Sequence, residues 1–196
     1  MFFVTHHDWL KCAREALAAL PKDGPVFLAG LSMGALLSVV LAAESPERIR
    51  ALALLAPAWK LAPPSARVLH RLRHFRLRSL RGLWVDKDST DLSDEKQAAA
   101  APLLPRYPVA RILDLFQVQD LARAGYPKVK APMLVVAARH DHVVPLSCVQ
   151  AMHESDVRAK VVVLERGFHI IPRDVERARA ATEICQFFDT HGAAAP

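Results

Sequence analysis

The sequence predicts an α/β fold in which helices flank a mostly parallel sheet. Short apolar runs bounded by Pro or Gly are too brief for helices and are typical of buried strands. These runs alternate with segments of helical length, which is typical of a parallel sheet with helical crossovers. At one junction, residues 26–45 (VFLAGLSMGALLSVVLAAES) join a predicted strand directly to a predicted helix through two glycines and a serine.

The first 57 residues contain two predicted helices and two predicted strands in alternation. Trp9, Ala13 and Ala16 are among the apolar positions that recur at helical spacing from Asp8, and Pro21 ends this helix. The other predicted elements are a strand over 25–30, a helix over 33–45 and a strand over 49–58.

The end of the chain repeats this alternation. It predicts a strand over 132–141, a helix over 145–156, a strand over 159–167 and a helix over 174–190. Residues 58–130 are rich in Pro and Arg and show no strand signal, which indicates a mostly helical insertion. We therefore expect a core formed by residues 1–57 and 131–196 and a helical cap formed by residues 58–130.

The composition is that of an ordinary globular protein. The 196 residues are 52% hydrophobic and 23% charged, which suits one domain with an inserted subdomain. Cys12, Cys148 and Cys185 are an odd number and lie far apart, which predicts neither a disulfide framework nor a zinc site but a reducing compartment. Cys185 shares helical spacing with Phe188, so we expect it in the core. The apolar start is too short for a signal peptide and no apolar run reaches the roughly 18 residues of a membrane span, so we expect a cytoplasmic location.

The stretch Gly30-Leu31-Ser32-Met33-Gly34 matches the G-x-S-x-G pattern of a nucleophilic serine. Between a strand and a helix, this pattern makes a sharp turn that exposes the serine hydroxyl, and the flanking glycines give the turn room. The backbone N–H of Met33 then points from the helix N-terminus toward an oxyanion formed at Ser32.

A serine hydroxyl needs a histidine to take its proton and an acid to orient that histidine. Asp141 ends the predicted strand over 132–141, and His169 follows the predicted strand over 159–167, 28 residues later. The order serine, acid, histidine at successive strand ends is that of one known catalytic arrangement on a parallel sheet. Ser32, Asp141 and His169 are therefore the predicted catalytic triad.

These segments resemble the α/β-hydrolase family, particularly bacterial carboxylesterases and monoacylglycerol lipases. The matching pieces are GLSMG, ARHDHVVP, GFHIIPRD and YPKVKAPMLVV. The resemblance implies Ser32 as nucleophile, Asp141 as orienting acid, His169 as general base and Met33 as an oxyanion donor. It also implies no cofactor, and short or medium acyl esters or monoacylglycerol as substrates.

The beginning of the chain departs from the family. Such enzymes usually begin with further strands and with a loop that donates a second oxyanion N–H, but only 31 residues precede Ser32 here. We therefore expect an N-terminally truncated fold, which is a fragment, a wrongly assigned start or a degenerate copy. The strand over 25–30 would then form an open sheet edge through which a second copy of the chain could pair.

Residues 67–84 hold six arginines and two histidines with no acid. On a helix, Val68, Leu69, Leu72, Phe75 and Leu83 would share one side, opposite a basic side. We interpret this as a cap helix with a solvated basic face; contact with an anionic membrane surface is the alternative. No recognition motif for nucleic acid accompanies these arginines. His6, His7, His140 and His142 lack further ligands at metal-site spacing, so we expect no metal.

Two other functions remain open at this stage. The same triad serves thioesterases and aminopeptidases, because function depends on the lining of the site rather than on the fold. A truncated chain could instead be a non-catalytic interaction protein with the hydrolase fold.

Overall fold

The computed structural model of the chain describes residues 4–73, 82–86, 90–101, 106–156 and 158–192. A four-stranded sheet lies at its centre, with the strand order β1-β2-β5-β6 and all neighbours parallel. The strands are β1 (Val26–Leu31), β2 (Ile49–Leu55), β5 (Met133–Ala138) and β6 (Ala159–Leu164). The predicted α/β fold with a mostly parallel sheet is confirmed.

Helices cover both faces of this sheet, and further helices form part of the insertion. They are α1 (His6–Ala19), α2 (Met33–Glu44), α3 (Pro64–Leu72), α4 (Glu95–Ala100), α5 (Val109–Gly125), α6 (Leu146–Ser155) and α7 (Arg177–Gly192). Short 3-10 turns follow α5 (η2, Tyr126–Lys128) and precede α7 (η3, Ile171–Arg173). Within the part of the chain that the structure describes, no helix has both the length and the apolar character needed to cross a bilayer.

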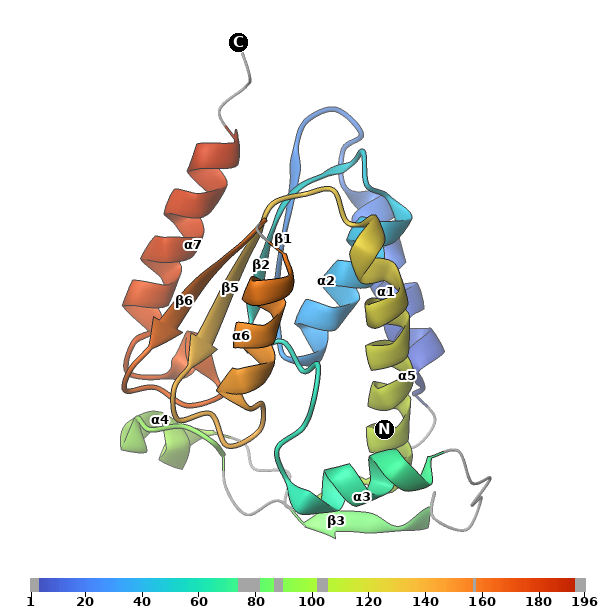
Figure 1. Cartoon of the computed structure of the whole chain (residues 1–196), viewed down its shortest axis with the longest axis vertical. Helices are drawn as coiled ribbons and strands as arrows, with labels where there is room; N and C mark the ends of the chain where they lie inside the picture. The colour runs from blue at the N-terminus through green and yellow to red at the C-terminus, as the bar shows by residue number, and fades with distance from the viewer. Residues whose placement is uncertain (1–3, 74–81, 87–89, 102–105, 157, 193–196) are drawn as a thin grey trace.

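The sheet separates two apolar cores because successive strand residues face opposite sides. On one face, Leu52, Leu54 and Met133 pack with apolar residues of α1, α2, α5 and α6. On the other face, Ala53 and Leu134 pack with residues of α7. Figure 1 shows α7 on one side of the sheet and α2, α5 and α6 on the other. The strands therefore form a buried platform with a helical layer on each face.

The insertion over 58–130 contains a strand pair that the sequence prediction missed. β3 (Trp84–Asp86) and β4 (Arg106–Pro108) form a two-stranded antiparallel sheet. Each strand has three residues, which is too short to show an alternating pattern, and residues 87–105 separate them. The lack of a strand signal therefore did not exclude strands, although most of the elements described in the insertion are helices.

The helix α5 belongs to the same insertion but packs against the sheet-flanking helices. Its Val118 and Ala122 are fully buried in the core that contains α2. Its Gln119 side chain donates a hydrogen bond of 2.7 Å to the carbonyl of Ala58. The insertion thus supplies one helix to the layer over the sheet. The boundary of the cap at residue 130 stays a prediction.

The predicted apolar side of the basic cap helix is also wrong. In α3, Val68 is 52% exposed and Leu72 is 36% exposed, while Ala66 is buried. The helix faces α5 through His70, whose ring centroid lies 5.0 Å from that of Phe116. Contacts with α5, rather than hydropathy, therefore select the buried side. The predicted helical positions over 74–81 lie outside the described residues.

Cys185 is exposed, so its predicted place in the core is wrong. The buried side of α7 runs through Ala180 and Phe187, with Ile184 partly buried between them. Because Cys185 is one residue beyond Ile184, it points about 100° away from this stripe.

At Gly30, β1 passes very close to the start of α2. A Cβ atom on Gly30 would lie 2.4 Å from the backbone carbonyl carbon and oxygen of Gly34 and 2.6 Å from the nitrogen of Ala35. A Cβ atom on Gly34 would meet nothing within 4 Å. Of the two glycines around Ser32, only Gly30 is therefore required by direct contact.

We expect Gly30→Ala to lower the free energy of unfolding by about 3 kcal/mol, because two backbone segments must separate to admit the methyl group. The matched variant Gly34→Ala should unfold at the same urea concentration as the unmodified chain or at a higher one. Urea denaturation followed by circular dichroism measures both variants. Equal midpoints for Gly30→Ala and Gly34→Ala would contradict the close packing of β1 on α2.

Candidate active site

Ser32 occupies the turn between β1 and α2 in a backbone conformation that is rare for a residue with a side chain. Its φ is 55° and its ψ is −111°. Such conformations cost about 1–3 kcal/mol and persist only where the surroundings hold them. Here the Ser32 N–H donates to the carbonyl of Leu55 at 2.8 Å, and the Ser32 carbonyl accepts from the N–H of Ala58 at 3.3 Å. The end of β2 thus holds the serine turn in place.

Asp141 and His169 form a buried pair. Their strands β5 and β6 are neighbours, and the Asp141 Oδ2 atom lies 2.8 Å from the His169 Nδ1 atom. The side chains are only 3% and 6% exposed. The Asp141 Oδ1 atom accepts hydrogen bonds from the N–H groups of Val143 and Val144 at 2.8 and 2.7 Å. These contacts fix the carboxylate, and through it the imidazole ring.

Ser32, Asp141 and His169 all follow the carboxyl ends of parallel strands, so they emerge at the same edge of the sheet. The structure brings Asp141 and His169 into contact. It records no hydrogen bond from the Ser32 hydroxyl among the described residues. Catalytic hydrogen bonds are often long in unliganded enzymes and shorten once substrate is bound.

The backbone N–H of Met33 is the first of α2. The first four N–H groups of a helix have no partner within that helix, and they carry partial positive charge. The Met33 N–H is therefore chemically suited to receive an anion formed beside Ser32.

The loop that carries His169 is held by carboxylates from the segment that follows it. The Glu176 Oε2 atom accepts from the N–H groups of Arg166 and Gly167 at 2.6 and 3.2 Å. The Asp174 Oδ2 atom accepts from the N–H of Phe168 at 2.6 Å. Three consecutive amides of this loop are thus bound by side chains that lie just before α7.

Both carboxylates are buried, yet each titrates below its ordinary range. Burial acts to raise the pKa of Asp174, but hydrogen bonds from Ser93, Phe168 and Val175 outweigh it and lower the pKa. Burial likewise acts to raise the pKa of Glu176, and the amides of Arg166 and Gly167 together with the Arg179 side chain lower it. Both groups are therefore ionised at neutral pH and act as acceptors.

The sequence analysis singled out neither Asp174 nor Glu176. An acidic residue just before a helix is expected to bind N–H groups of that helix, but the donors here belong to the preceding loop. A third carboxylate, Asp91, also lies in this site and was missed as well. It comes from the insertion, in a polar segment without periodicity, and no feature of the sequence marks it.

Asp91, Asp141 and His169 each offer a possible ligand atom, and these atoms lie within 4.8 Å of one another. Such a grouping can bind a metal ion. Here, however, each carboxylate oxygen already has a polar partner. The Asp91 oxygens contact the His169 N–H and the His142 ring, and the Asp141 oxygens contact two amides and the His169 ring. Hydrogen bonding explains the grouping better than metal ligation does.

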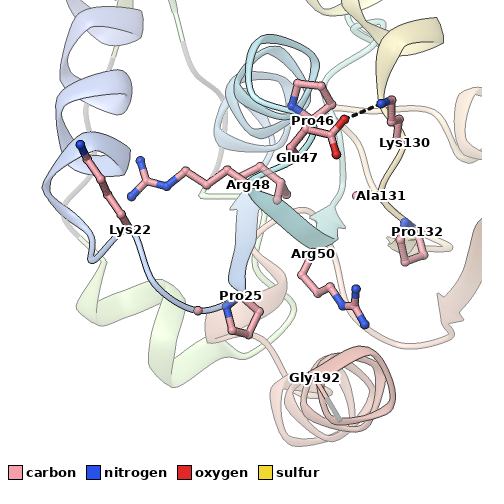
Figure 2. Close-up of a pocket in the computed structure, with 12 residues that line it drawn as sticks. Lys22, Pro25, Pro46, Glu47, Arg48, Arg50, Lys130, Ala131, Pro132 and Gly192 are labelled. Atoms are coloured by element: carbon pink, nitrogen blue, oxygen red, sulfur yellow. Dashed lines mark hydrogen bonds and ion pairs between the residues drawn. The ribbon is translucent and has the colours of Figure 1, made fainter. Parts of the chain in front are cut away.

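A cavity of about 640 Å³ lies at the opposite end of the sheet. It is lined by residues at the amino ends of the strands, including Ile49 at the start of β2. Figure 2 shows Pro25, before β1, and Pro132, before β5, in this lining. Ser32 follows the carboxyl end of β1, and a strand of this length spans roughly 20 Å. This cavity is therefore separate from the candidate active site.

Arg48, Arg50 and Lys130, which line that cavity, have partners within the protein. Arg48 and Arg50 donate to backbone carbonyls at 2.7 and 2.8 Å, and Lys130 forms an ion pair of 2.5 Å with Glu47 (Figure 2). These contacts tie the loops at the amino ends of the strands together.

Comparisons with known proteins show the family and the fold. The family described as serine aminopeptidase, S33, matches residues 4–176. A thermostable monoacylglycerol lipase from Bacillus sp. (strain H-257) is 24% identical over 196 positions, which cover 95% of this chain and 72% of that protein.

Solved structures show the same fold. A structure from work on LipS and LipT, two metagenome-derived lipolytic enzymes, matches with a TM-score of 0.80 at 23% identity. The match covers 97% of this chain and 76% of that chain. The monoacylglycerol lipase of Paleococcus ferrophilus has a TM-score of 0.76 at 18% identity, covering 96% and 76%. The monoglyceride lipase of Saccharomyces cerevisiae has a TM-score of 0.71 at 16% identity, covering 97% and 69%. The family match over residues 4–176, on a parallel sheet of this topology, confirms the predicted resemblance: the chain belongs to the serine aminopeptidase S33 family of α/β-hydrolases.

Proposed function

We propose that this chain is a serine hydrolase that cleaves carboxylic esters through an acyl-enzyme intermediate on Ser32. The observation that carries the proposal is the buried contact between Asp141 and His169, at the sheet edge where the Ser32 turn also lies. An oriented histidine near a serine on a strained turn is the arrangement that acyl transfer requires.

In the proposed mechanism, the Ser32 Oγ atom attacks the ester carbonyl carbon and its proton passes to the His169 Nε2 atom. The Nδ1 atom is not available for this proton because it faces Asp141. The Met33 N–H donates to the oxyanion that forms on the carbonyl oxygen. Collapse of this intermediate breaks the bond to the alcohol oxygen, and His169 returns the proton to the departing alcohol. Water then repeats the sequence and releases the acid.

The substrate class rests on similarity to other proteins. The similar proteins include monoacylglycerol lipases and other lipolytic enzymes. We therefore propose short or medium acyl esters, or monoacylglycerol, as substrates. The alternatives are acyl thioesters and aminoacyl amides, and the description of the family as serine aminopeptidases favours testing the latter.

We also propose that the exposed side of α3 contacts anionic lipid surfaces. Arg67 and Arg71 are exposed beside Val68 and Leu72, so one helix side offers positive charge and apolar groups together. That combination is typical of helices that lie on membranes.

Pairing of a second copy along the outer edge of β1 stays a prediction, which light scattering tests. A cytoplasmic location also stays a prediction; the three cysteines are free, as a reducing compartment requires.

The catalytic proposal predicts that the chain hydrolyses 4-nitrophenyl acyl esters or monoacylglycerol. Ser32→Ala should lower kcat by about 10⁴-fold or more, because the nucleophile is lost. Ser38→Ala is the matched control, since Ser38 lies in α2, the helix that Ser32 precedes, and its hydroxyl donates to the carbonyl of Gly34. It should retain activity. A folded chain that hydrolyses no ester, thioester or amide would favour the non-catalytic alternative.

The lipid proposal predicts binding to vesicles that contain phosphatidylserine and weaker binding to pure phosphatidylcholine vesicles. Replacing both Arg67 and Arg71 by Gln should weaken binding about 30-fold, at about 1 kcal/mol for each charge. Replacing the exposed Arg14 and Arg139, which are paired with acidic residues elsewhere, provides the control. Sedimentation with vesicles measures the effect, and equal binding to both kinds of vesicle would contradict an electrostatic contact.

A further inference from the structure

Asp91 contacts the catalytic histidine loop from outside the sheet. Its Oδ2 atom accepts a hydrogen bond of 3.0 Å from the backbone N–H of His169. Its backbone carbonyl accepts from the N–H of Ile170 at 3.4 Å. Its Oδ1 atom lies 2.5 Å from the Nδ1 atom of His142, which is next to Asp141 in the chain. One residue of the insertion therefore contacts both loops that carry the proposed acid and base.

The conformation of Asp91 fits a role in positioning. Asp91 is 5% exposed, and its φ of 51° lies in the left-handed region. Asp tolerates this region better than most residues do, but a residue held there in a buried place is a recognised mark of functional sites. A buried carboxylate also needs donors, and His169 and His142 provide them.

The neighbours of Asp91 are docked on the same loop. The Asp174 Oδ1 atom accepts from the N–H and hydroxyl of Ser93 at 3.1 and 2.6 Å and from the N–H of Asp94 at 2.9 Å. The Asp174 Oδ2 atom meanwhile holds the N–H of Phe168. The segment 91–94 and the histidine loop are thus joined on both sides of His169.

His169 consequently has two anchors. Asp141 orients the ring through Nδ1, and Asp91 fixes the backbone through the amide. An oriented ring on a displaced backbone would still miss the proton of Ser32, and a misplacement of about 1 Å can cost about 10²-fold in rate. The position of the base thus depends on its backbone as well as on the orientation of its ring.

We propose that Asp91 is a positioning residue for His169, by which the insertion completes the active site. This inference rests on the proposed function of Ser32 and His169. Asp91 acts through the histidine loop, so its loss should change the chemical step rather than substrate binding. The insertion is then more than a cover over the site, because one of its carboxylates sets the place of the general base.

The test compares Asp91→Ala and Asp91→Asn in the full chain, with Asp114→Ala as control. Asp114 is buried to a similar degree, 6% against 5% exposed, but pairs with His6 and Arg111 in another part of the molecule. We expect Asp91→Ala to lower kcat for a 4-nitrophenyl ester about 10- to 100-fold with KM changed less than twofold. Asp91→Asn should recover much of that loss, because its side-chain oxygen can still accept the amide of His169. Asp114→Ala should lower thermal stability but leave kcat within twofold.

Hydrogen exchange provides a measurement that does not depend on activity. The amides of residues 168–170 should exchange faster in Asp91→Ala than in the unmodified chain. In Asp114→Ala their exchange rates should equal those of the unmodified chain. An unchanged exchange rate in Asp91→Ala would overturn the inference, whether or not the chain is active. A kcat within twofold of the unmodified chain, or an equal loss in Asp114→Ala, would overturn it too. An unmodified chain that hydrolyses nothing would instead refute the proposed function.

Discussion

The candidate site depends on the buried contact between Asp141 and His169. A carboxylate with only 3% of its side chain exposed has lost most of its water, so it must find donors within the protein. It finds them in two backbone amides and one imidazole nitrogen. Removing one partner of such a buried pair typically lowers the free energy of unfolding by about 3–5 kcal/mol. The stability of the surrounding structure therefore depends on the pair.

This requirement extends to the histidine loop. The four consecutive N–H groups of residues 166–169 all donate to side-chain carboxylates, from Glu176, Asp174 and Asp91. Buried amides without partners are costly, and regular secondary structure is not available to this loop. Carboxylates from two separate parts of the chain replace it. The result is a loop without helix or strand that nonetheless has a defined backbone at the point where the proposed base is attached.

The fold could be predicted, and the triad proposed, because the sequence signals for both are local. The strands are short apolar runs, α2 is apolar on all sides, and the serine lies in a pattern whose spacing is itself the signal. The errors have a common cause. The buried side of α3 depends on α5, the register of α7 depends on the sheet, and β3 pairs with a strand distant in sequence. The sequence analysis missed Asp91 for the same reason, because its partners His142 and His169 are distant in the chain.

If Ser32 is an activated nucleophile, it should react with a fluorophosphonate probe. We would treat the purified full chain with such a probe and locate the adduct by peptide mass spectrometry. We expect one adduct, on Ser32, which disappears in His169→Ala and persists in Ser38→Ala. A folded chain that forms no adduct, or that forms it on another residue, would show that Ser32 is not the nucleophile.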